Sequence, residues 1–284
     1  VYGLPKDLQL GAIYYNKDHY DAAGLSYPSP DWTYDDLLQN AKRLTVVGAD
    51  NQVTRYGFRL PTSRNWAPLI WAFGGDLLDS WTQPTRFTGD SDQVAAALQY
   101  LHDLVQLKAV QDKATFESVG TTAAFMSQKV SMLLTNSVVM ADFGAIKDFA
   151  WDVAPFPQGP AGAVPYINAI GWFMFKGSAH PEASWEVLRY FTSQEALRRR
   201  VAVIGNIPPS RQVILDSWLP SRAQPAGRAL LLNHIEQARS PWMLDERVFD
   251  PMNKEVLAAI WGEKSVQNAI QTMKQEVTGI LAED

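Results

Sequence analysis

The chain has 284 residues, of which 46% are hydrophobic and 19% charged, proportions typical of a globular protein with a substantial core. Its formal net charge of -5 gives no electrostatic reason to bind nucleic acid or an anionic membrane, and no apolar run approaches the ~18 residues that a membrane helix needs. The absence of cysteine excludes a disulfide framework, a thiolate nucleophile and a Cys zinc site.

The first predicted element is a buried strand. A Pro/Gly turn leads into an apolar run that ends in Tyr14 and Tyr15, and a polar Asn-Lys-Asp corner follows at 16–18. Such β-favouring runs between turn residues are typical of strands. Residues 17–23 then predict a short helix that stops at Gly24, a residue that adopts the left-handed cap cheaply.

Strands and helices alternate through the next 150 residues. Thr33 and Asp36 have the spacing of a capping box, which predicts a helix beginning there. Further strands are predicted over 55–60, 74–78, 129–134, 151–157 and 166–176, and further helices over 66–72, 90–108, 123–127 and 136–149. This alternation favours an α/β sheet over a sandwich or a helical bundle.

From Pro181 onward the pattern is almost entirely helical. Trp185, Leu188 and Phe191 share one helical face, and Ser265 caps the last helix. We expect Trp185, Trp218 and Trp261 to lie in the core.

Catalytic and metal-binding motifs are absent from the sequence. There is no Gly-x-Ser-x-Gly elbow, His-Glu-x-x-His, Walker loop or Gly-x-Gly-x-x-Gly, so we expect no cofactor and no metal. The four histidines are scattered, and we expect them to be solvated or to cap helices. Acidic residues are plentiful, so a glycosidase-type carboxylate pair stays open, although nothing selects one.

Five segments together resemble the extracellular solute-binding proteins of family 1, the maltose-binding-protein-like sugar carriers of ABC importers. The segments are 14–18 (YYNKD), 32–33 (WT), 74–76 (GGD), 151–157 (WDVAPFP) and 171–172 (GW). The resemblance implies an α/β, periplasmic-binding-protein-like fold of type II, a Venus flytrap that closes two lobes on a ligand.

The resemblance also implies a division of the chain. Residues 1–7 would form a hinge crossing, 8–168 the second lobe, 169–240 a second crossing with the helical remainder of the first lobe, and 241–284 closing helices packed on the second lobe. Relatives normally carry a secretion signal and most of the first lobe before this point, so we expect a truncated chain. The helical face near Trp185 would then lie open and favour self-association, and sugar affinity should be weak or nil.

A sugar site needs flat aromatic faces for the ring and polar side chains for the hydroxyls. At positions where the family has cleft loops, the candidate ligand-binding residues are Asp7, Ser63, Arg64, Asn65, Trp66, Asn136, Gly171, Trp172, Trp242 and Phe249. Arg64 departs from the acidic and aromatic pattern common in the family, and Val138 replaces a common tryptophan. Core packing stays open as an alternative for Trp66, and a simple turn carboxylate for Asp7.

What the resemblance implies is a non-enzymatic carrier that binds a sugar or oligosaccharide and delivers it to ABC transporter permease subunits. Its location would be periplasmic or extracellular, with lipid anchoring of a longer parent. One alternative is a carbohydrate-active enzyme that uses a carboxylate pair. Another is a binding protein for a non-sugar anionic solute, because the Arg64 guanidinium matches carboxylate or phosphate geometry.

Overall fold

The computed structural model describes residues 3–61, 63–221, 225–241 and 245–283. The strands are β1 (Gly3–Asn16), β2 (Val46–Val47), β3 (Val53–Arg59), β4 (Val130–Asn136), β5 (Trp151–Ala154) and β6 (Ile167–Phe173). The α-helices are α1 (Lys17–Ala22), α2 (Tyr34–Leu44), α3 (Ala67–Ala72), α4 (Asp92–Gln106), α5 (Lys113–Ser118), α6 (Thr121–Met126), α7 (Met140–Phe143), α8 (Pro181–Phe191), α9 (Gln194–Val203), α10 (Arg211–Val213), α11 (Glu246–Ile260) and α12 (Val266–Leu281). Tighter or wider helical turns are η1 (Ser63–Trp66), η2 (Ser137–Val139), η3 (Ile214–Trp218), η4 (Leu219–Ser221) and η5 (Ala226–Leu232).

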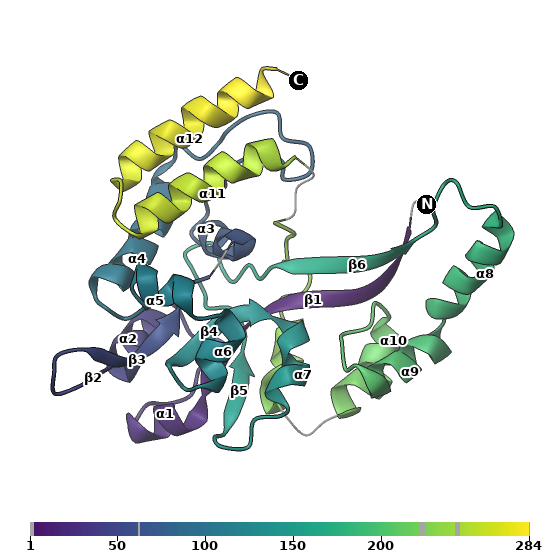
Figure 1. Cartoon of the computed structure of the whole chain (residues 1–284), viewed down its shortest axis with the longest axis horizontal. Helices are drawn as coiled ribbons and strands as arrows, with labels where there is room; N and C mark the ends of the chain where they lie inside the picture. The colour runs from purple at the N-terminus through teal and green to yellow at the C-terminus, as the bar shows by residue number, and fades with distance from the viewer. Residues whose placement is uncertain (1–2, 62, 222–224, 242–244, 284) are drawn as a thin grey trace.

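Strand β1 is the centre of the sheet. The order is β2-β3-β4-β1-β5, with β6 also paired to β1, and every partner of β1 is antiparallel to it. The half of β1 from Gly3 to Leu10 pairs with β6, whereas the half from Gly11 onward pairs with β4 and β5. The β1–β6 register shifts between Pro5 and Asp7, next to a residue that has no N–H to donate. Figure 1 shows the result, a two-stranded ribbon that runs from the main body to α8, α9 and α10.

The main sheet carries a hydrophobic core on each face, because successive residues of a strand point to opposite sides. Ile13 and Tyr15 of β1 belong to a core with α2, α3, α4, α11 and α12, whereas Tyr14 belongs to a second core with α6, α7, α9 and η3. Leu197 and Trp218 lie in this second core. The segment after the ribbon is therefore packed partly against the main sheet.

Helix α2 lies very close to β3. Its capping box forms as the sequence predicts, with Thr33 and Asp36 exchanging hydrogen bonds at 2.7 and 3.1 Å. Opposite the helix stands Gly57, where a Cβ atom would lie 1.8 Å from the backbone oxygen of Ala41. The sheet can approach α2 only because position 57 carries no side chain.

The predicted strand over 74–78 is wrong. In this stretch the ladder is reduced to one bridge between Leu78 and Phe87, and Gly74 adopts a left-handed conformation with φ +87° at the end of α3. The Asp76 carboxylate accepts a hydrogen bond from the backbone N–H of Leu77, so a side chain organises this loop. The helix predicted over 136–149 is also too long, since only η2 and α7 form there.

Two expectations about burial need correction. Trp185 is 44% exposed on α8, whereas Trp218 is buried and Trp261 half-buried. His19 is buried at the start of α1, with Nδ1 3.0 Å from Ser131 Oγ, so it is not a solvated histidine. Among the described residues, none of the helices combines the length and apolar character needed to span a bilayer.

Candidate functional site

Two aromatic rings stack inside the main body, in the core between α3 and α11. Trp66, the last residue of η1, and Phe249, in α11, lie parallel within 1° with centroids 6.2 Å apart. Trp66 is fully buried, and its indole N–H donates to Asn253 Oδ1 at 3.0 Å. Trp81 packs against Trp66 with a centroid distance of 6.1 Å. Because Trp66 is buried and hydrogen-bonded, it provides a fixed surface against which the Phe249 ring packs.

Arg64 lies on the stacked rings. Its guanidinium carbon is 3.8 Å from the Phe249 centroid, and its Nη2 donates to both carboxylate oxygens of Glu246 at 2.5 and 2.6 Å. The Arg64 side chain is 11% exposed, whereas that of Glu246 is 58% exposed. The bond therefore joins η1 to the first turn of α11, and we name Arg64, Trp66, Trp81, Glu246 and Phe249 the Arg64 cluster.

Two further arginines adjoin the Arg64 cluster, and each is paired with a carboxylate. Asp76 accepts from the indole N–H of Trp81 at 2.7 Å and forms an ion pair with Arg239. Asp245, the N-cap of α11, pairs with Arg247 at 2.7 Å, and this hydrogen-bonded pairing lowers the pKa of Asp245.

Arg239 connects the Arg64 cluster to the ribbon. Its carbonyl oxygen accepts from the N–H of Ile167 at 3.0 Å, and a parallel bridge joins it to Tyr166 at the start of β6. Its guanidinium lies 4.3 Å from the ring centroid of Trp71. Charged and aromatic groups of the main body are thus placed next to the point where β6 begins.

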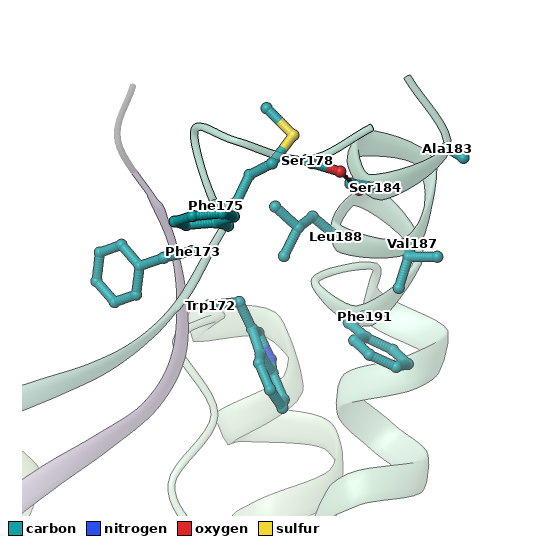
Figure 2. Close-up of a pocket in the computed structure, with 10 residues that line it drawn as sticks. Trp172, Phe173, Phe175, Ser178, Ala183, Ser184, Val187, Leu188 and Phe191 are labelled. Carbon is teal, nitrogen blue, oxygen red and sulfur yellow. Dashed lines mark hydrogen bonds between the residues drawn. The ribbon is translucent and has the colours of Figure 1, made fainter. Parts of the chain in front are cut away.

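Trp172 lies at the other end of β6, with α8 and α9. Its ring centroid is 5.4 Å from that of Phe191, and Lys6 Nζ stands 4.9 Å from it. Figure 2 shows the Trp172 and Phe191 rings side by side, while Phe173 points to the other side of the strand. Trp172, Leu188 and Phe191 help to line a cavity of about 430 Å³ between the end of β6 and α8. A second cavity of about 420 Å³ between Trp172 and Arg200 continues along α9.

Asp7 is held by protein groups. Its carboxylate accepts from Arg200 Nε and Nη2 at 2.7 and 2.8 Å, and from Asn206 at 3.2 Å. The residue is 3% exposed. This geometry fastens the ribbon to α9, and direct ligand contact by Asp7 stays a prediction.

The remaining candidates are dispersed. Asn136 ends β4, where its Oδ1 accepts from the N–H of Val138 at 3.0 Å, and its Cα pairs with Gly11 of β1. Gly171 pairs with Pro5 in the ribbon. Asn65 is half-buried in η1 beside Arg64, Ser63 opens the same turn, and Trp242 lies outside the described residues.

Residues 2–197 match the model of the bacterial extracellular solute-binding protein family. The chain belongs to this family. A binding protein of Brucella abortus strain 2308 is 25% identical over 242 residues, which is 82% of this chain and 56% of the relative. A binding protein of Brucella suis biovar 1 gives the same values. The chain therefore spans little more than half the length of these curated relatives.

Solved structures of this kind share the fold. An ABC substrate-binding protein of Listeria monocytogenes, in complex with cycloalternan, is 23% identical with a TM-score of 0.87, over 99% of this chain and 72% of the other. The GacH receptor of Streptomyces glaucescens is 22% identical with a TM-score of 0.80, over 100% of this chain and 72% of the other. These likenesses confirm the α/β fold of the type II periplasmic binding proteins.

The sequence predicted three of the five residues of the Arg64 cluster as site candidates. Arg64 and Trp66, predicted from one loop, and Phe249, predicted from a later one, come together as one stack. Glu246 and Arg239 were missed, since nothing local in the sequence marks a pairing across 182 or 163 positions. Trp172 and Asp7 form a second group on the side of α8 and α9. Among the described residues, His, Asp and Glu side chains do not converge in threes as metal ligands would.

Proposed function

We propose that this chain binds a sugar or oligosaccharide as the solute-binding component of an ABC importer. The observation that carries the proposal is the Arg64 cluster, where a buried aromatic stack stands beside paired guanidinium and carboxylate groups in a member of a solute-binding family. Aromatic faces suit sugar rings, and charged side chains suit hydroxyls. The similar Listeria and Streptomyces proteins were solved with cycloalternan and with acarbose, which supports the same ligand class here.

The ribbon of β1 and β6 connects the two groups of residues that we propose to bind the ligand. In our proposal β1 and β6 are hinge crossings between two lobes, with the Arg64 cluster on one side of the cleft and Trp172 on the other. Residues 1–7, 8–168, 169–240 and 241–284 keep the roles expected from the sequence. The ligand would meet Arg64 and Asn65 from the main body, with Phe249 supporting the Arg64 guanidinium from beneath, and Gly171 and Trp172 from the ribbon.

The proposed role is binding and delivery, without catalysis. Lobe closure would trap the ligand through many hydrogen bonds, and the closed form would be recognised by permease subunits of the transporter. This places the protein in the periplasm or outside the cell. A carbohydrate-active enzyme would instead need two carboxylates at a defined separation around a glycosidic bond.

A titration followed by tryptophan fluorescence tests the proposal. Adding maltotriose or mannobiose should change the emission saturably, with a Kd of about the millimolar range, and release no shorter sugar. Trp172→Ala should weaken binding, whereas Lys113→Ala, at an exposed ion pair with Glu263, should leave it unchanged. Release of reducing ends would favour the enzyme, and failure of every oligosaccharide tested would overturn the carrier proposal.

A further inference from the structure

The cationic groups near the proposed cleft are matched by anionic ones. Arg64, Arg239 and Arg247 pair with Glu246, Asp76 and Asp245, so three positive charges face three negative ones. The Asp76–Arg239 and Arg64–Glu246 pairs are linked by direct contacts, because Asp76 accepts from Trp81, Trp81 packs on Trp66, and the stack continues to Phe249 and Arg64. This region therefore has guanidinium groups without a net positive charge.

Such pairs suit one kind of ligand group. A hydroxyl both donates and accepts, so neighbouring hydroxyls can accept from a guanidinium N–H and donate to the adjacent carboxylate. A carboxylate or phosphate can only accept, and it would meet the negative charge of Glu246 or Asp76 at the same place. Like charges brought together across an interface oppose binding.

Glu246 is the central group in this argument. Its side chain is 58% exposed while that of Arg64 is 11% exposed, so an approaching ligand meets the carboxylate more readily than the guanidinium. The Arg64 guanidinium carbon also lies 3.8 Å from the Phe249 ring centroid, and the two hydrogen bonds to Glu246 hold the guanidinium there.

We infer that the Arg64–Glu246 pair makes the site selective for an uncharged polyhydroxy ligand, and that Glu246 is the residue that excludes acidic sugars and other anions. The inference rests on the proposed function and narrows it. It removes the anionic solute that Arg64 alone would suggest, because the guanidinium is already neutralised by its neighbour.

The test compares the wild type with Glu246→Gln, which keeps the shape and removes the charge. Neutral maltotriose and acidic digalacturonate are titrated against each protein by calorimetry. The wild type should prefer the neutral sugar, and Glu246→Gln should shift the ratio of the two affinities toward the acidic sugar by about tenfold or more. The matched control is Glu263→Gln, which removes an exposed carboxylate paired with Lys113 beyond the far end of α11 and should leave the ratio unchanged.

A second arm needs no sugar. Sodium sulfate is added while the side-chain N–H resonance of Arg64 and the indole resonances are followed by NMR, with sodium chloride at equal ionic strength as reference. Sulfate should perturb Arg64 in Glu246→Gln and leave it unperturbed in the wild type and in Glu263→Gln.

The outcomes separate the two proposals. If neither sugar binds the wild type, the carrier proposal fails while the sulfate arm still decides the role of Glu246. If the wild type binds digalacturonate as tightly as maltotriose, or sulfate perturbs its Arg64, the inference is overturned. An unchanged affinity ratio and an unchanged sulfate response in Glu246→Gln would also overturn it.

Discussion

His19 is a buried titratable group outside the proposed site. Burial lowers its pKa from the ordinary 6.5 to about 4, and repulsion from Arg55 acts in the same direction. Between these two pH values the unfolded chain binds a proton that the folded chain does not. The stability contributed by neutral His19 is therefore complete above pH 6.5 and is lost progressively as the pH falls toward 4.

We predict that His19→Gln flattens this part of the stability profile. The free energy of unfolding of the wild type should fall by on the order of 2 kcal/mol more than that of the variant between pH 6.5 and 4, after allowance for solvent screening. Urea unfolding of both proteins at a series of pH values measures this difference in the free energy of unfolding. Parallel profiles for the two proteins would show that His19 does not carry this proton linkage.

The Asp7–Arg200 pair gives a prediction about the ribbon. Asp7→Asn should destabilise the protein by about 1–3 kcal/mol, because Arg200 and Asn206 lose an ionised acceptor in a largely buried place. Asp216→Asn, which breaks the more exposed pair with Arg198, is the control and should cost less, because solvent screens that pair. Equal losses of free energy of unfolding in the two variants would contradict a clamp at Asp7.

At the scale of single residues, the sequence predicted which side chains are site candidates better than it predicted which side chains they contact. It marked Arg64, Trp66 and Phe249 as candidates, and the structure brings them together. It could not show that Arg64 pairs with Glu246, because charges that are distant in the chain meet only through the packing of α11 on η1. For the same reason the sequence could not show that the Asp7 carboxylate, a candidate ligand contact, is paired with Arg200.

At the scale of elements, periodicity and caps were reliable where local physics decides the structure. The capping box at Thr33 and the N-cap at Ser265 both form. The error over 74–78 has a physical cause, since Leu77 and Leu78 are apolar and buried as in a strand. The backbone N–H of Leu77 donates to the Asp76 side chain instead of to a neighbouring strand. A hydrogen bond of this kind leaves no periodic pattern in the sequence from which it could be predicted.

The contact between α2 and β3 yields a matched pair of glycine substitutions. Gly57→Ala places a methyl group 1.8 Å from the oxygen of Ala41, and we expect a loss of about 3 kcal/mol or more because two backbones must separate. Gly279→Ala adds the same methyl group to α12 where no atom lies within 4 Å, and should stabilise by about 0.5–1 kcal/mol. Thermal unfolding of both variants measures the contrast. Similar melting temperatures would show that α2 and β3 are not packed this closely.

At the scale of the molecule, apolar surface is distributed unevenly. Ten of the sixteen exposed large apolar side chains in the described ranges fall between positions 170 and 204: Ile170, Phe173, Met174, Phe175, Trp185, Val187, Tyr190, Phe191, Val203 and Ile204. They belong to β6, the turn after it, α8 and the end of α9, that is, to the ribbon and the helices to which it leads (Figure 1). The helical periodicity predicted a shared apolar face on α8, and the structure leaves that face largely exposed.

The exposed apolar side chains of α8 are costly to leave in water, since buried apolar area contributes roughly 25 cal/mol per Å². Strand β6 lies next to this apolar surface and pairs with β1 along one edge. It carries no charged residue from Ile167 to Phe173 that would oppose pairing along its other edge. An uncharged strand edge is a template for pairing with another strand.

We therefore expect the chain to associate with a second copy through the apolar face of α8 and the edge of β6, reaching a mass near twice 31.7 kDa in light scattering as concentration rises. Val187→Lys, at a side chain 52% exposed on α8, should restore the monomer, whereas Val47→Lys, at one 51% exposed on β2, should not. A wild-type mass that stays at 31.7 kDa over the whole concentration series would refute the association.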